Sequence, residues 1–385
     1  MKKPLIGSIL AFATLLAACG GAPPAATSNP TTGATAAATA DPCGVPVKGK
    51  CPTEAQAVTG AGATFPGPLY TKWVDQYNQL TGVQINYQAV GSGGGIKSFT
   101  DKTVDFGASD VPLTDAQFDA IPGGLYMVPM ALGAVVPTYN VPNVTAAIKF
   151  SPEALAGIYL EQIKKWNDPK ITAENPGVTL PDLAITTVHR SDGSGTTGVF
   201  TDYLSKVSPE WKTKVGSATS VNWPGGVGGS GNAGVAGAVK NQAGTIGYVE
   251  LIYAIQNKLG YGVVKNAAGK YVEASLDSTT KAADGFVSPD FGNLKGQAAK
   301  ISITNATGAD AWPISTFTFL LLPKDFSDKA KGLAITRFAW YGTHDGQSFA
   351  KDLGYAPLPS AVQKAAEEVL KSITSGGAKL LKVNP

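Results

Sequence analysis

The alternation of strand-like and helix-like segments from about residue 56 onward is the feature that most constrains this fold. Residues 83–89 alternate apolar and polar side chains, as a half-buried strand does. Apolar side chains between Leu69 and Leu80 recur at helical spacing and predict an amphipathic helix over 68–80. Alternating elements favour an α/β architecture, and 385 residues suffice for two such domains. The further predicted strands are 183–189, 244–249 and 317–322, and the further predicted helices begin at Ser151 or cover about 327–342 and 360–372.

Three loops rich in glycine or small residues stand between a predicted strand and a predicted helix. They are 60–66, 91–95 and 189–197. A helix N-terminus offers free backbone N–H groups and the positive end of the helix dipole, so it readily binds an anion. Glycines let the backbone approach that anion, and serine and threonine hydroxyls add donors. One such loop is weak evidence, but three predict a site for a small tetrahedral oxyanion.

Arginine usage supports an anion site in the third loop. The chain has only two arginines, Arg190 and Arg337, against 29 lysines. Arg190 lies inside the third loop, and its planar fork suits an oxyanion better than a lysine does. Asp192, two residues away, would hold the guanidinium in place; a surface Arg190–Asp192 pair is the alternative. Arg337 lies in an apolar helical stretch and is interpreted as structural.

The composition excludes several classes of function. Lysine and arginine total 31 and aspartate and glutamate 28, and the mature chain predicted below lacks Lys2 and Lys3, which leaves 29 basic residues. A nearly neutral chain has no general electrostatic reason to bind nucleic acid. Two histidines and three cysteines make a zinc enzyme improbable. The nucleotide-binding glycine motifs and the Gly-x-Ser-x-Gly elbow are absent from the sequence, and His189 is the only plausible base for a nucleophilic serine.

The first eighteen residues have the pattern of a secretory signal. Two lysines precede an apolar run of about a dozen residues, which is too short to span a bilayer, and small residues follow. The sequence Leu-Ala-Ala-Cys ending at Cys19 is similar to a bacterial lipobox, in which the cysteine becomes the lipidated first residue of the mature chain. An ordinary signal peptide that contains a cysteine is the alternative. We therefore expect a lipoprotein signal peptide at 1–18.

The next segment is predicted to connect the anchor to the folded body. Residues 20 to about 42 are mostly Ala, Gly, Pro, Ser and Thr, which bury too little surface to offset their ordering entropy. Cys43 and Cys51 flank a turn-rich loop, and outside the reducing cytosol two such cysteines favour a disulfide. A metal site is the minor alternative. We assign 19–55 to the lipid anchor and a flexible linker.

Six short segments between about residues 58 and 359 match one known pattern. They are 60–70 (GAGATFPGPLY), 104–113 (VDFGASDVPL), 158–166 (IYLEQIKKW), 190–196 (RSDGSGT), 244–250 (GTIGYVE) and 310–314 (DAWPI). In these segments the chain resembles the phosphate-binding proteins of Pst-type ABC transporters. The resemblance implies a two-domain periplasmic-binding-protein fold (type II, Venus-flytrap) that closes about a two-strand hinge. Its domains would be 56–139 with 309–385, and 140–308.

The resemblance also implies a function and a ligand set. The protein would bind inorganic phosphate with high affinity outside the cytoplasmic membrane of a bacterium and deliver it to the transmembrane permease subunits of an ABC transporter for import. It would be a monomer without enzymatic activity, cofactor or metal, held to the membrane only by its lipid anchor. The phosphate ligands carried over by position are Thr64, Phe65, Ser92, Asp110, Arg190, Asp192, Ser194, Gly195 and Thr196.

Each implied ligand has a role, and the chain departs from the pattern twice. Backbone N–H groups and hydroxyls would donate, Arg190 would add a charged fork held by Asp192, and Asp110 would be the one acceptor. The family carries a second serine where this chain has Gly93, which keeps a backbone donor but loses a hydroxyl. It carries an arginine where this chain has His189, which replaces a permanent charge by a titratable one.

Three rival functions remain open at this stage. A phosphatase could use the same contacts but needs a nucleophile with a base, or metals. A binding protein for sulfate or another oxyanion is the closer rival, and Asp110 argues against it because its carboxylate requires a proton on the ligand. A surface interaction protein would leave the three anion loops unexplained.

Overall fold

The computed structural model describes residues 41–286, 289–297 and 300–384. The predicted signal peptide 1–18, the lipobox Cys19 and most of the predicted linker lie outside the described residues. Among the residues described, no helix is both long enough and apolar enough to cross a membrane.

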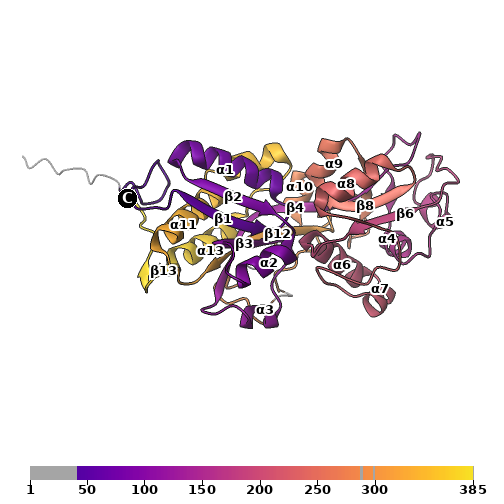
Figure 1. Cartoon of the computed structure of the whole chain (residues 1–385). Helices are drawn as coiled ribbons and strands as arrows, with labels where there is room; N and C mark the ends of the chain where they lie inside the picture. Colours follow the sequence, from indigo (N-terminus) through magenta and orange to yellow (C-terminus); the bar gives the residue numbers. More distant parts are fainter. Residues whose placement is uncertain (1–40, 287–288, 298–299, 385) are drawn as a thin grey trace, which may run out of the picture. The chain divides into compact units, whose positions relative to one another are not determined.

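A mixed nine-stranded sheet forms the centre of the described chain (Figure 1). Its order is β2-β1-β3-β12-β4-β8-β6-β7, with β9 paired to β4. Neighbouring strands are parallel in the pairs β1–β2, β1–β3, β6–β7 and β6–β8, and β12 runs antiparallel to both β3 and β4. The strands are β1 (Ala57–Gly62), β2 (Gln84–Ala89), β3 (Phe106–Ser109), β4 (Leu125–Tyr139), β6 (Thr186–Arg190), β7 (Val227–Gly229), β8 (Thr245–Glu250), β9 (Gly260–Tyr261) and β12 (Ser315–Pro323).

Strand β4 joins the two halves of this sheet. Its first part, from Leu125 to Ala134, pairs with β12, and its last part, from Val135 to Tyr139, pairs with β8. All but one of its fifteen residues are buried, as expected for a strand covered on both faces. One half of the sheet therefore contains β2, β1, β3 and β12, and the other contains β8, β6 and β7.

Helices cover both halves of the sheet (Figure 1). The longer ones are α1 (Gly67–Thr81), α2 (Ser92–Thr100), α4 (Pro152–Tyr159), α6 (Gly195–Val207), α8 (Gly231–Asn241), α9 (Leu251–Asn257), α11 (Lys329–Thr343) and α13 (Ser360–Ser372). The short helices are α3 (Asp115–Asp119), α5 (Pro169–Thr172), α7 (Pro209–Lys214), α10 (Leu276–Lys281) and α12 (Gln347–Ala350). The small strands are β5 (Lys149–Phe150), β10 (Val263–Lys265), β11 (Tyr271–Val272), β13 (Thr374–Ser375) and β14 (Ala378–Lys379).

Most predicted elements form within one or two residues of their expected bounds, and two details differ. Leu80 on the predicted apolar face of α1 is 37% exposed, whereas Trp73 and Tyr77 are buried. The strand predicted from residue 183 begins at Thr186, because the backbone from Leu183 to Ile185 pairs instead with residues 164–166. Long-range pairing therefore shortened a strand whose sequence pattern continues further back.

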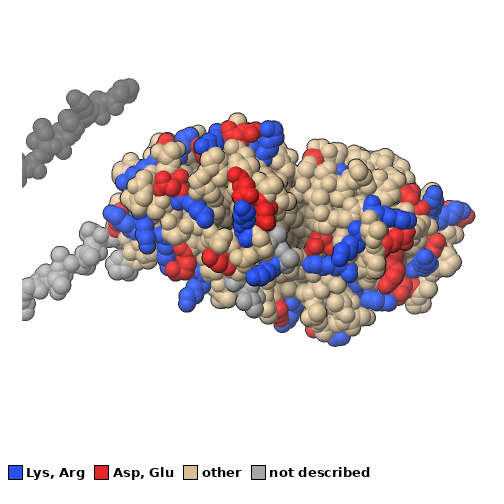
Figure 2. Space-filling model, turned by 90° about the horizontal axis from the view of Figure 1, so that it is seen from below, with Lys and Arg blue, Asp and Glu red and all other residues tan. Residues whose placement is uncertain are grey.

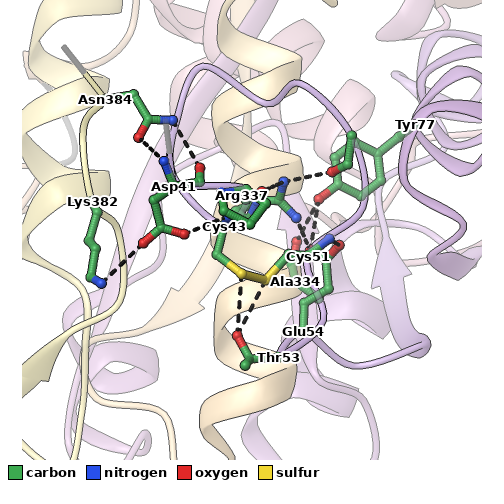
Figure 3. The surroundings of a disulfide bond; sticks show 12 residues. Asp41, Cys43, Cys51, Thr53, Glu54, Tyr77, Ala334, Arg337, Lys382 and Asn384 are labelled. Carbon is green, nitrogen blue, oxygen red and sulfur yellow. Dashed lines mark hydrogen bonds and ion pairs between the residues drawn. A yellow bond between two sulfur atoms is a disulfide. The ribbon is translucent and has the colours of Figure 1, made fainter. Parts of the chain in front are cut away.

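The segment from Asp41 to Ala55 packs on the body, so the predicted flexible linker ends earlier than residue 55. Val45 is fully buried, and its N–H donates to the carbonyl of Lys382 (2.8 Å). The Cys43 and Cys51 sulfurs form a disulfide with an S–S distance of 1.99 Å (Figure 3).

Arg337 ties this segment to helix α11. Its guanidinium forms a fully buried ion pair with Glu54 and donates to the carbonyls of Pro42 (3.1 Å) and Gly49 (2.9 Å) (Figure 3). The structural interpretation of Arg337 agrees with these contacts, because a buried guanidinium needs partners for its charge and its donors.

A loop assigned by sequence to the second domain lies against the first half of the sheet. The rings of Phe286 and Phe291 contact Phe317 and Phe319 of β12, at centroid distances of 4.9 and 6.3 Å. The N–H of Gly296 donates to Asp115 at the start of α3 (2.7 Å). The domain boundaries remain a prediction, and these contacts of the loop are with elements of the expected first domain.

Candidate anion-binding site

Four helix N-termini meet at the candidate site, two from each half of the sheet. Helices α1, α2, α6 and α8 follow strands β1, β2, β6 and β7 directly, so they begin at the carboxyl ends of those strands. The carboxyl ends of strands in open α/β sheets are the usual place for a ligand. The two halves also contact each other there: Gly195 N–H donates to Ser92 Oγ (3.1 Å), and Gly93 N–H donates to the Gly193 carbonyl (2.9 Å).

The polar side chains at this junction are buried. Ser92, Ser194 and Thr196 have no exposed surface, and Thr64, Asp110 and Arg190 have less than a tenth. Buried hydroxyls require partners, and Ser194 has one, because its Oγ accepts from Thr197 N–H and caps α6. These six members of the sequence-predicted set therefore lie in one enclosed polar cluster, and Phe65 is also fully buried, whereas Asp192 is partly exposed.

Arg190 and Asp192 form a two-point ion pair inside the cluster. Arg190 Nε donates to Asp192 Oδ1 (2.7 Å), Nη2 donates to Asp192 Oδ2, and Nη1 donates to Thr196 Oγ1 (3.3 Å). The N–H of Gly231 also donates to Asp192 Oδ1 (2.9 Å). Burial alone would raise the pKa of Asp192, but the hydrogen bonds and charge of Arg190 lower it below its usual value. The carboxylate thus holds one edge of the guanidinium and leaves N–H groups of the other edge for a ligand.

Asp110 is the buried acid among these donors. Its Oδ1 accepts from Thr318 Oγ1 (2.8 Å), and its Oδ2 accepts a long hydrogen bond from Ser92 Oγ (3.4 Å). Burial raises the pKa of Asp110 to about 7, although Thr318, Arg190 and Ser92 each lower it. Near neutral pH this carboxyl can therefore either accept a hydrogen bond from a protonated ligand or carry a proton itself.

Two glycines are required where the loops approach each other. A Cβ on Gly195 would lie 2.5 Å from both Asp110 Oδ2 and Ser92 Oγ, so a side chain there would fill the site. Gly91 has φ +90°, and a Cβ on it would lie 2.3 Å from Asp192 Oδ2. Any other residue at these positions would separate the two halves of the site.

The two departures from the family pattern have different surroundings. Gly93 keeps its backbone N–H, as expected, but that N–H is bonded to the Gly193 carbonyl across the junction. His189 stacks on Trp223, with ring centroids 5.0 Å apart, and its Nδ1 lies 3.1 Å from the Arg190 carbonyl oxygen. The imidazole therefore packs against an aromatic cluster.

Sequence reasoning missed several residues that support the cluster. Asn232 at the start of α8 bonds to Thr64 and Thr196, Tyr248 accepts from Arg190 N–H (3.1 Å), and Thr318 holds Asp110. A fourth glycine-rich segment at 225–231, which contains β7 and leads into α8, was the available signal for Asn232. Tyr248 and Thr318 lie within buried strands, where one hydroxyl in an apolar run gives no such signal.

A cavity of about 330 Å³ borders the cluster through Asp110. Residues of α6, including Asp202, and the segment from Ile301 to Thr304 also line it. No group of three or more histidine, cysteine, aspartate or glutamate side chains suited to a metal occurs among the described residues. On the face that Figure 2 shows, acidic and basic side chains are interspersed.

Comparison with known proteins links the chain to one group. Residues 25–335 match the model of the PBP superfamily domain. The chain is 48% identical over 316 residues to phosphate-binding protein PstS of Xylella fastidiosa strain Temecula1, which covers 82% of this chain and 85% of that protein. It is 38% identical to the protein of the same name from Methanocaldococcus jannaschii, covering 79% and 82%.

Solved structures give the same fold. A high-affinity periplasmic phosphate-binding protein bound with phosphate matches with a TM-score of 0.64 at 21% identity, covering 81% of this chain and 93% of that one. A phosphate-binding protein from Stenotrophomonas maltophilia matches with a TM-score of 0.64 at 19% identity, covering 84% and 96%. At these identities the likeness concerns the fold, which is the two-domain periplasmic-binding fold.

Proposed function

Since the chain belongs to the PstS family of phosphate-binding proteins, we propose that its buried polar cluster binds inorganic phosphate outside the cytoplasm and delivers it to the permease of an ABC transporter. Members of this family are substrate-binding proteins of transporters and not enzymes. The chain is accordingly a binding protein, and phosphate is its substrate for transport.

The observation that carries the proposal is the ratio of donors to acceptors. Helix N-termini, hydroxyls and one guanidinium surround two acids. Asp192 is paired with Arg190, whereas Oδ2 of Asp110 has only a long partner. A tetrahedral oxyanion offers many lone pairs to those donors, and a protonated one also offers a hydrogen to Asp110. Phosphate near neutral pH has both, which sulfate does not.

We assign the ligand contacts to the residues expected from the sequence. Arg190 supplies the charged N–H groups, Asp192 orients it, and Asp110 accepts the ligand's proton. The remaining contacts are the backbone N–H groups or hydroxyls of Thr64, Phe65, Ser92, Ser194, Gly195 and Thr196. Two tyrosines hold the backbone of the Thr64–Phe65 segment in place. The Tyr253 hydroxyl donates to the Thr64 carbonyl, and the Tyr355 hydroxyl donates to the Phe65 carbonyl (2.6 Å each).

Calorimetric titration of the soluble domain tests this function. Phosphate should bind with one site per chain, and sulfate should bind far more weakly. Comparable curves for the two anions would leave only a general oxyanion binder, and absence of any phosphate heat would refute the proposal. The same sample should not release p-nitrophenol from p-nitrophenyl phosphate, which separates binding from phosphatase activity.

We further propose that ligand exchange requires the two halves to separate about the strands that join them. The domains would be 56–139 with 309–385, and 140–308, with β4 and the segment entering β12 as the hinge. The contacts of Ser92 and Gly93 with the α6 loop support this, because a buried ligand could enter only after they break. Small-angle scattering should show a smaller radius of gyration with phosphate than without it.

We also propose that the protein is a monomeric lipoprotein anchored through Cys19 to a bacterial membrane. The signal pattern of 1–18 and the position of Cys19 at its end support this. The wild-type protein should stay with the membrane fraction and carry lipid mass on Cys19. Cys19→Ala should release the protein or leave it unprocessed, and a native chain with residues 1–18 intact would contradict the anchor.

A further inference from the structure

Asn232 lies fully buried where the two halves of the site meet, and the ligand set above does not include it. It is the second residue of α8, yet its side chain reaches hydroxyls on two other elements. Its Nδ2 donates to Oγ1 of Thr64 before α1 (2.9 Å) and to Oγ1 of Thr196 in α6 (3.1 Å). One amide therefore contacts a proposed phosphate ligand from each half of the sheet.

The orientation of this amide is fixed by its other end. The backbone N–H of Glu250 donates to Asn232 Oδ1 (2.8 Å). A backbone N–H can only donate, so the atom facing it must be the carbonyl oxygen. The NH₂ group must then face the two threonines.

The hydrogen bonds that each threonine hydroxyl already accepts determine whether it can donate to a ligand or accept from it. Thr64 Oγ1 receives hydrogen bonds from Asn232 Nδ2 and from Asn232 N (3.2 Å). Thr196 Oγ1 receives them from Asn232 Nδ2 and from Arg190 Nη1 (3.3 Å). A hydroxyl has two lone pairs and one proton. Because both lone pairs are used on each oxygen, only the two protons remain for a ligand.

We infer that Asn232 is a positioning residue that turns the Thr64 and Thr196 hydroxyls into obligatory donors toward the bound anion. This inference rests on the proposed phosphate function and extends it to specificity. A ligand oxygen that faces either threonine must be unprotonated, because no lone pair is left to accept its proton. A proton on the ligand is thereby kept away from both threonines and can face Asp110, the carboxylate proposed to accept it.

Two substitutions separate this role from simple packing. Asn232→Ala removes the amide and lets both hydroxyls rotate. Phosphate affinity should then fall at least about tenfold, because a hydrogen bond to a charged group contributes about 1.5–3 kcal/mol. Asn232→Asp keeps the size and the acceptor for Glu250 N–H, but its carboxylate attracts both hydroxyl protons away from the ligand. We expect phosphate to bind more weakly to the aspartate variant than to the alanine variant.

A matched control exists elsewhere in the chain. Asn175 is also buried and makes the same kinds of bond: its Nδ2 donates to the carbonyls of Lys149 and Ile171, and its Oδ1 accepts from Lys149 N–H. Asn175→Ala should lower the melting temperature measured without phosphate and leave phosphate affinity within about twofold of the wild type. Comparison with Asn232→Ala then separates loss of fold stability from loss of orientation.

A double-mutant cycle provides the decisive readout. Thr64→Val and Thr196→Val remove the hydroxyls that Asn232 orients. In the protein carrying both valines, adding Asn232→Ala should change phosphate affinity by less than about threefold, because no hydroxyl remains to orient. Adding Asn232→Asp to that protein measures the effect of its charge alone.

The outcomes of these titrations are distinguishable. If wild-type protein binds no phosphate, the proposed function fails. If it binds phosphate but Asn232→Ala binds within about twofold of it, or loses the same factor with and without the two hydroxyls, the inference fails. Wild-type affinity in Asn232→Asp would overturn it as well, even if the alanine variant does not fold.

Discussion

Asp110→Asn tests whether one buried carboxyl makes the site prefer phosphate over sulfate. The wild-type Oδ1 is occupied by Thr318, whereas Oδ2 faces the N-terminus of α6 and has only a 3.4 Å hydrogen bond from Ser92. Phosphate near neutral pH brings a proton to Oδ2. Sulfate brings only lone pairs and negative charge, so the two anions differ at this one contact although they are nearly the same size.

The expected magnitude follows from the burial of Asp110, which is 1% exposed. An unpaired contact between like charges in such a site costs several kcal/mol, and at about 3 kcal/mol sulfate binds to the protein with ionised Asp110 roughly a hundredfold more weakly than phosphate does. The asparagine offers an N–H to sulfate and removes the charge. The substitution also removes the charge-assisted hydrogen bond between phosphate and the carboxylate, which contributes about 1.5–3 kcal/mol to phosphate binding. At pH 8.5, where Asp110 with its pKa of about 7 is ionised, the phosphate-to-sulfate ratio of affinities should therefore fall at least about a hundredfold.

The pH dependence of sulfate binding gives an independent measure. Burial raises the pKa of Asp110 to about 7, and sulfate does not titrate near this pH. Below the pKa the carboxyl is protonated and can donate to sulfate, and above it the charge repels sulfate. Wild-type sulfate affinity should therefore rise as the pH falls, by about 30-fold from pH 8.5 to pH 6. Asp110→Asn removes this carboxyl, so its curve should be much flatter than the wild-type curve over the same interval.

Calorimetric titration with both anions at several pH values measures the phosphate affinity, the sulfate affinity and the pH dependence of sulfate binding. Asp202→Asn is the matched control: its carboxylate lines the neighbouring cavity and accepts from Ser302 and Thr304, so the same charge is removed outside the ligand set. The control should keep the wild-type ratio. A ratio unchanged within about threefold in Asp110→Asn, or a wild-type sulfate affinity independent of pH, would refute the proton-counting argument.

Three further predictions concern the charged fork and the stability of the body. Arg190→Ala should weaken phosphate binding by about 1.5–3 kcal/mol or more in calorimetry, because it removes the one guanidinium in the site; an unchanged affinity would exclude Arg190 as a ligand. Arg337→Met should lower the free energy of unfolding in urea by about 3–5 kcal/mol, because Glu54 is left as an unpaired buried charge, and adding Glu54→Gln should recover part of that loss. Replacing Cys43 and Cys51 by serine should lower the free energy of unfolding by at most about 2.5 kcal/mol in the same assay, because the disulfide closes a short loop with a sequence separation of 8. A larger loss would mean that the disulfide does more than restrict that loop.

The sequence by itself determined the elements that depend on near neighbours. The helix over Gly67–Thr81 and the buried strand through Phe317 and Leu322 follow from periodicity, which is a property of a few turns or residues. The Arg190–Asp192 pair is equally local, since its partners are two positions apart. The ligand set itself came from family resemblance, because spacing alone predicted an anion loop without naming its acceptor.

Only the tertiary structure decided how these local pieces combine. Asn232 and Thr64 are 168 positions apart. They meet because β1 runs parallel to β4 and β7 runs antiparallel to it, in halves that pair with different parts of β4, so the carboxyl ends of β1 and β7 face each other. The raised pKa of Asp110 arises from burial that depends on β12 being inserted beside β3. The exposure of Leu80 and the contact of His189 with Trp223 are likewise consequences of packing. Short-range patterns fix where helices and strands form, whereas burial and hydrogen-bond partners depend on strand order, which no short window of sequence contains.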